Sequence, residues 1–143
     1  MELLIAVLII GILAAIAIPQ YKKAVIKSHL VSMLPYVRAV MDAQEEYYMV
    51  NNAYANSVNE LNTNVTCPPK WACVVTNTKV EVYEKPYLTI IGRYNLLPRR
   101  VAGAIYCWAT YTDVKNSAMY RNICKSFGPL LADDSDGISY RIQ

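Results

Sequence analysis

The most unusual chemistry in the chain lies at its beginning, where an ionisable residue stands directly before an apolar segment. Glu2 precedes sixteen residues, Leu3 to Ile18, that carry no charged or polar side chain. A lone ionisable group in hydrocarbon costs about 2.5–3.5 kcal/mol on insertion scales. The nearest basic residues, Lys22 and Lys23, lie at the far end of the segment. We therefore expect Glu2 to take a positive partner from elsewhere, as a bundle of packed helices would allow.

The four cysteines form the second reactive set, and all lie beyond the apolar segment. They are Cys67, Cys73, Cys107 and Cys124. An even number of cysteines outside such a segment suits disulfides in an oxidising compartment. Of the three possible pairings, locality favours Cys67–Cys73 and Cys107–Cys124. The second would add about 3 kcal/mol in the chain-entropy model.

A zinc site is the alternative use of these cysteines. The sequence has no Cys-x-x-Cys, and its one histidine, His29, lies far upstream. We therefore predict no metal site and no cofactor.

The length and net charge of the chain limit the number of domains and the kinds of partner. The 143 residues fit one domain plus an anchor, and the net charge of +3 comes from scattered basic residues, so no nucleic-acid partner is predicted. The apolar segment spans about 24 Å as a helix, short of the ~20 residues that usually cross a bilayer. A signal peptide would need positive charge before the segment, where Glu2 stands, although Ala14, Ala15 and Ala17 resemble a cleavage site.

Residues 3 to about 50 predict one long helix, and Glu2 lies directly before its first turn. Past Tyr21 the pattern becomes amphipathic, with Gln44 filling one apolar position. Pro19 and Pro35 should each kink or locally open this helix, and Gly11 weakens it. Two interpretations stay open: the kinks are harmless, or the stretch between Gly11 and Pro19 unwinds to fit a curved fibre. The apolar positions of the amphipathic half are Ile26, Leu30, Met33, Val37, Val40 and Tyr47.

The remaining residues predict an antiparallel sheet, and with the long helix an α+β fold. Ser57 to Glu60 has capping-box spacing and predicts one short helical turn. Short turns separate the first three β-rich runs, which favours a meander. The runs are 72–76, 79–84, 87–94 and 103–111, followed by a helix over 113–124 and a terminal strand over 138–142.

Residues Glu2 to Tyr21 resemble the N-terminal helix of type IV pilins and of the related type II secretion pseudopilins. Looser similarities to pilins follow at Glu45–Tyr48, Asn52–Ala55 and Val58–Leu61, and around Cys107 and Cys124. Family precursors carry a basic leader ending in Gly, then an aromatic residue or Met, then Thr-Leu-Ile. This sequence has Met1 where the family usually has Ile. We expect a start site assigned too late, or a trimmed sequence, with the processing site upstream.

The resemblance implies a pilin fold: a long kinked helix packed on a four-stranded or similar antiparallel sheet, with a disulfide-closed C-terminal region. Residues 1–21 would form the transmembrane and filament-core half of the helix, and residues 22–143 the globular head. In the family the matching glutamate is thought to neutralise the N-terminal ammonium of the adjacent subunit. The expected assembly residues are Glu2, Leu3, Leu4, Gly11 and Pro19.

The function that the resemblance implies is that of a structural, non-enzymatic subunit of a type IV pilus-like filament. Its expected partners are copies of itself, an inner-membrane assembly machinery and membrane lipid. It would cross the bacterial inner membrane once before assembly and lie in a cell-surface filament afterwards. Whether the fibre serves adhesion, motility or DNA uptake stays open.

Three alternatives remain. A type II secretion pseudopilin shares the helix, and calcium near Asp134 and Asp136 would favour it, although the spacing fails the EF-hand pattern. A membrane-tethered periplasmic binding or enzymatic domain is the second, although the sequence has no Gly-rich phosphate loop and no Gly-x-Ser-x-Gly. In the third, Glu2 lies idle among lipid headgroups.

Overall fold

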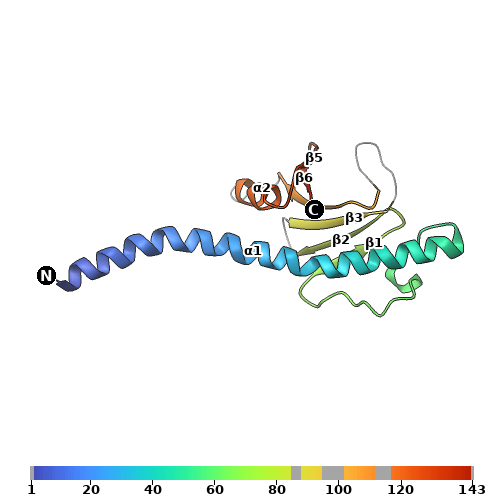
Figure 1. The fold of residues 1–143 in the computed structure, drawn as a ribbon, viewed down its shortest axis with the longest axis horizontal. Coiled ribbons are helices and arrows are strands. Elements are labelled where there is room, and N and C mark those ends of the chain that lie inside the picture. The colour runs from blue at the N-terminus through green and yellow to red at the C-terminus, as the bar shows by residue number, and fades with distance from the viewer. Residues whose placement is uncertain (1, 85–87, 95–101, 112–116, 143) are drawn as a thin grey trace.

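One helix runs through the first third of the chain, and only its second half belongs to the globular head. The computed structural model describes residues 2–84, 88–94, 102–111 and 117–142. Helix α1 spans Glu2–Asn51 as one continuous element that includes Pro19 and Pro35. Figure 1 shows its first half projecting from the head and its axis bending there. The predicted long helix is confirmed, and no described residue of it is unwound.

The head is built on a six-stranded sheet in which every neighbouring pair of strands is antiparallel. The strand order is β1-β2-β3-β4-β6-β5, so the first four strands form a meander and the chain then returns beside β4. The predicted α+β fold class is therefore confirmed. The strands are β1 (Ala72–Val75), β2 (Lys79–Glu84), β3 (Leu88–Arg93), β4 (Ile105–Thr110), β5 (Leu130–Asp133) and β6 (Gly137–Arg141).

The number of strands, the second helix and the short helical turn differ in detail from the prediction. The sheet has six strands, whereas the β-rich runs predicted five and the resemblance implied four or a similar number. The additional strand is β5, which pairs with the terminal strand through an irregular register. Helix α2 spans Ser117–Lys125, and the earlier part of the predicted helix, residues 113–116, lies outside the described residues. The turn predicted from Ser57 to Glu60 is a short 3-10 helix, η1 (Val58–Glu60).

The second half of α1 covers one face of the sheet. Val80, Val82 and Ile90 are fully buried beneath it. Gly92 on β3 has no side chain because a Cβ there would lie 2.8 Å from Cγ1 of Val37, inside van der Waals contact. The close approach of helix and sheet thus depends on glycine at this position. Buried residues of α1 are Leu30, Met33, Tyr36, Val37, Val40 and Gln44.

Gln44 is a polar side chain in this apolar layer, and it fixes the chain that leaves the helix. It is 0% exposed. Its Nε2 donates to the carbonyl oxygen of Ala55 at 3.0 Å, and its Oε1 accepts from the Ala55 N–H at 2.8 Å. The helix ends just before, where Asn52 takes a positive φ of 52° and its N–H donates to the Tyr48 carbonyl. Gln44 therefore satisfies both backbone groups of a buried loop residue.

A second polar contact ties the same loop to the sheet. The hydroxyl of Tyr94 donates to the carbonyl oxygen of Thr76 at 2.8 Å, and Gln44 Nε2 lies 3.4 Å from that hydroxyl. The ring of Tyr54 packs on Tyr94 with centroids 5.1 Å apart. Burial raises the pKa of Tyr94 well above its usual value.

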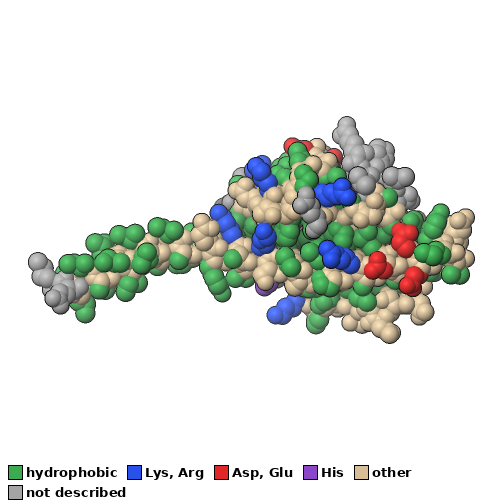
Figure 2. All heavy atoms as spheres, viewed as in Figure 1, with side chains coloured by type: hydrophobic (Ala, Val, Ile, Leu, Met, Phe, Trp, Pro, Cys, Tyr) green, Lys and Arg blue, Asp and Glu red, His purple; other side chains and the backbone are tan. Residues whose placement is uncertain are grey.

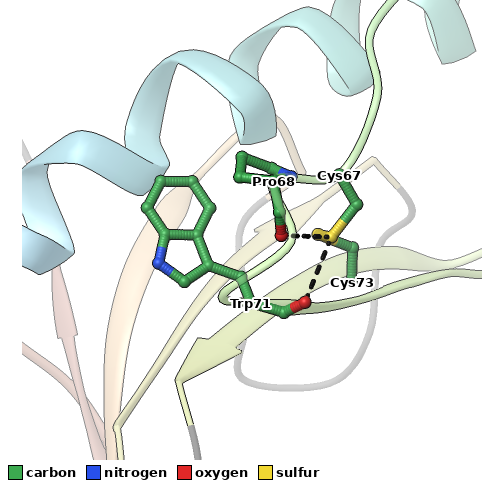
Figure 3. Close-up of a disulfide and its surroundings, with 4 residues drawn as sticks. All are labelled: Cys67, Pro68, Trp71 and Cys73. Atoms are coloured by element: carbon green, nitrogen blue, oxygen red, sulfur yellow. Dashed lines mark hydrogen bonds between the residues drawn. A yellow bond between two sulfur atoms is a disulfide. The ribbon is translucent and has the colours of Figure 1, made fainter.

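Two disulfides close the head. The structure joins Cys67 to Cys73 and Cys107 to Cys124, the pairings that locality favours. Cys107 and Cys124 are 0% exposed and link β4 to α2. Figure 3 shows the other bridge, which closes the loop before β1, and Trp71 in the same loop.

Replacing Gln44 with leucine should lower the free energy of unfolding by about 2–4 kcal/mol, because both backbone groups of Ala55 would be buried without partners. Chemical denaturation of the detergent-solubilised protein, followed by circular dichroism, measures this. Glu46→Gln, at an exposed position on the same helix, is the control and should change stability by less than about 0.5 kcal/mol. Equal stability of the Gln44→Leu variant and the parent protein would contradict this role.

Alkaline pH should destabilise the head through Tyr94. Its pKa is raised in the folded protein above the ordinary value of 10.0, so unfolding releases a proton above that pH. The contribution of Tyr94 is fully present below pH ~10 and falls by about 1.4 kcal/mol per pH unit above it. Tyr94→Phe should start less stable at pH 7 yet lose less stability between pH 9 and 11. The exposed-site control Tyr21→Phe should follow the parent protein, and parallel curves for all three would refute the assignment.

Candidate functional site

The largest unexplained surface is the projecting half of α1. Its side chains are apolar on all sides and lie in solvent, from Leu3 at 78% exposed to Ile18 at 53%. Figure 2 shows hydrophobic side chains along the projecting half of α1 on the face in view. We call residues 3–18 the apolar rod. Its large exposed members are Leu3, Leu4, Ile5, Val7, Leu8, Ile9, Ile10, Ile12, Leu13, Ile16 and Ile18.

This surface differs from the scattered apolar residues that soluble proteins expose. An isolated exposed leucine is ordinary, whereas a contiguous apolar patch marks an interaction with protein or membrane. The helix that carries the rod is long and apolar enough to cross a membrane. None of its most apolar stretch is buried against the head. A signal sequence at an N-terminus would pass the same test. The exposed apolar surface of the rod is therefore unfavourable in water.

The predicted assembly residues are spread along the first half of α1, from Glu2 to Pro19. Glu2 is the first residue of α1, and its side chain lies outside the description. Leu3 and Leu4 are highly exposed, and a Cβ built on Gly11 would meet nothing within 4 Å. Pro19 lies about 24 Å beyond Leu3 at the helical rise per residue. The structure therefore does not gather these residues into a cluster.

Charge begins where the rod meets the head. Residues 3–21 contain no ionisable side chain except the phenol of Tyr21, and Lys22 and Lys23 follow at exposed positions. Lys27 then lies over the ring of Phe127, with its Nζ 5.1 Å from the ring centroid. Long basic side chains at such a boundary keep their ammonium groups in water while their stems cover apolar surface. This arrangement sets the depth to which the rod can be buried.

The acidic side chains and the histidine of the described residues form no cluster that suits metal binding or catalysis. Among the residues that the structure describes, no group of three or more His, Cys, Asp or Glu side chains is placed to hold a metal. Asp133 accepts a hydrogen bond from the hydroxyl of Tyr111, which raises the pKa of Tyr111. The Asp134 N–H donates to the Gly137 carbonyl at 2.9 Å, which closes the turn between β5 and β6. His29 lies at an exposed position on α1.

Sequence reasoning did not find the polar layer on the opposite face of the sheet. Arg93 is only 8% exposed and donates from Nε to the hydroxyl of Tyr106, which is fully buried. The signal that could have found it was alternation, since Lys79, Glu81 and Tyr83 occupy alternate positions of β2.

The chain matches no family model, no curated protein and no solved structure. Its architecture, a long N-terminal helix on an antiparallel sheet with two disulfides, fits a pilin-like fold.

Removing residues 1–21 should convert a detergent-dependent protein into a water-soluble one. The buried part of α1 begins with the half-buried residues 25–27, so the head keeps its core contacts. Size-exclusion chromatography of both forms without detergent, with thiol titration to count disulfides, measures this. The full chain should elute as large aggregates and the truncated chain as a monomer with both bridges. A monodisperse full chain in plain buffer would contradict the exposure of the apolar rod.

Proposed function

We propose that this protein is the structural subunit of a type IV pilus-like filament, and that its apolar rods pack together in the filament core. The observation that carries the proposal is the division of one continuous helix into a packed half and a bare apolar half. Before assembly the rod would lie in the bacterial inner membrane as a single-pass anchor. Assembly machinery in that membrane would then transfer the subunit into a cell-surface fibre.

The energetics favour covering the rod in either environment. Burying a large aliphatic side chain is worth about 1.5–3 kcal/mol relative to leaving it in water. The rod exposes such side chains along its whole length. Lipid tails remove most of this driving force between helices, so helix contact there depends on close approach. Gly11, Ala14 and Ala15 supply the small side chains that permit it. The same rod can therefore serve a membrane first and a helix bundle later.

Glu2 supplies the selectivity that apolar packing lacks. An apolar rod can slide along its neighbours with little change in energy, whereas a carboxylate in hydrocarbon is stable only beside a positive partner. The N-terminal ammonium of an adjacent subunit is the partner that we propose. A carboxylate–ammonium contact in a medium of low dielectric would fix the axial register of neighbouring rods.

A plain membrane anchor on a periplasmic binding domain would use the same apolar surface, and a secretion pseudopilin would use the same helix. The first would tolerate loss of Glu2, because an anchor needs no register. The second would assemble a short fibre beneath the cell surface. The role of Glu2 therefore separates a tethered domain from a filament subunit.

Replacing Glu2 with alanine should abolish fibres or reduce them at least tenfold, while the subunit stays in the membrane fraction at its normal level. Electron microscopy of sheared surface material, with immunoblots of membranes, measures both quantities in the native cell. Glu46→Ala, which removes an exposed carboxylate from the head, is the matched control and should leave fibres intact. Normal fibres from the Glu2→Ala subunit would refute the proposed contact.

A further inference from the structure

The face of the sheet opposite α1 carries a cavity that filament assembly through the rod does not use. Side chains at alternate positions of three strands meet there, because Lys79 pairs with Arg93 across β2 and β3 and Thr89 pairs with Trp108 across β3 and β4. The cavity has a volume of about 360 Å³. This is within the range of about 300–1,000 Å³ that small-molecule sites occupy. Its lining residues are Lys79, Glu81, Tyr83, Thr89, Ile91, Arg93, Trp108 and Asp136.

Arg93 is held in place before any ligand arrives. It is 8% exposed, and its Nε donates to the hydroxyl of Tyr106 at 2.5 Å. Its guanidinium makes no second hydrogen bond to a residue that the structure describes, so its other N–H groups remain as donors at the cavity wall. A side chain that is already ordered loses little entropy on binding.

The charges of the lining residues balance. Lys79 and Arg93 are positive, Glu81 and Asp136 are negative, and Lys79 forms an ion pair with Glu81. A phosphate or a polyanion would meet two carboxylates here, which disfavours it. A purely apolar ligand would cover the donors of Arg93 and the carboxylate of Asp136 without giving them hydrogen-bond partners, which costs free energy.

Two aromatic rings also line the cavity. Tyr83 and Trp108 are half-buried, on strands whose backbone is fixed by pairing on both sides. Flat rings next to paired donors and acceptors suit a ligand with one apolar face and a rim of hydroxyl groups. A pyranose ring has this composition, since its axial C–H groups form an apolar face and each hydroxyl both donates and accepts.

We propose that this cavity binds a neutral sugar residue, which packs on Trp108 and Tyr83 and hydrogen-bonds through its hydroxyl groups to Arg93 and Asp136. The site lies on the head and needs no second subunit. The inference goes beyond the filament proposal and does not depend on it, because the binding belongs to the monomer.

The full chain in detergent micelles allows a direct test, because the sequence has only two tryptophans, Trp71 and Trp108. Trp71 does not line the cavity, so Trp71→Phe leaves Trp108 as the only tryptophan reporter. Its fluorescence is titrated with methyl glycosides of mannose, galactose, glucose, fucose and the two common N-acetylhexosamines. N-Acetylneuraminic acid and inorganic phosphate are the anionic comparisons. We expect saturable binding of at least one neutral glycoside, with a dissociation constant on the order of millimolar.

Two variants tie the signal to the cavity. Asp136→Asn and Arg93→Lys should each weaken binding at least tenfold, because the first removes a charged acceptor and the second removes the planar fork of donors. Asp42→Asn, on the exposed side of α1, is the control and should bind as the parent does. Circular dichroism and disulfide content establish that each variant is folded, and Asp136 is exposed enough for its substitution to leave the fold intact.

The proposal is overturned if no neutral glycoside gives a saturable signal. Tighter binding of phosphate or N-acetylneuraminic acid than of any neutral sugar would overturn it as well. Unchanged affinity in folded Asp136→Asn protein would place the binding elsewhere and would equally reject this site. Filament formation enters none of these measurements, so their failure leaves the filament proposal untouched.

Discussion

The organisation of the molecule depends on one constraint: an uninterrupted apolar surface must be kept from water, and the described part of the chain provides no cover for it. The second half of α1 finds its cover within the chain, because Val37, Val40 and Met33 are buried against the sheet. The first half has no such partner among the described residues, and its large side chains stay exposed. Since burial of each is worth about 1.5–3 kcal/mol, we expect the rod to lie in lipid or against other proteins.

The head acts as a rigid holder for this rod. Gly92 lets the helix lie directly on β3, Gln44 fixes the chain as it leaves the helix, and the buried Cys107–Cys124 bridge joins β4 to α2. Each of these contacts is made within one chain and is satisfied without a partner molecule. Among the described residues, the contacts of the head thus leave the rod without a covering partner.

Much of this could be predicted from the sequence, because local patterns decided it. The helical spacing from Ile26 to Val40 predicted the buried face of α1, and alternation predicted the meander of β1 to β4. Strand β5 could not be predicted, because Leu130–Asp133 has little alternation and becomes a strand only through pairing with β6. The hydrogen bonds between Gln44 and Ala55 could not be predicted either. They join residues eleven positions apart through a turn whose shape the sequence does not specify. The assembly residues were predicted from chemistry and resemblance, and the partner that we propose for Glu2 belongs to another molecule.

The most direct measurement is photo-crosslinking in the native cell from a photoreactive amino acid placed at Ile9, in the middle of the rod. If rods pack together, gel electrophoresis should resolve a ladder of covalent products at integral multiples of the subunit mass. The same group at Asn64, an exposed loop position on the head, provides the comparison. A probe at Ile9 that yields only unlinked subunit or lipid adducts, in cells that produce the protein at its normal level, would contradict the account.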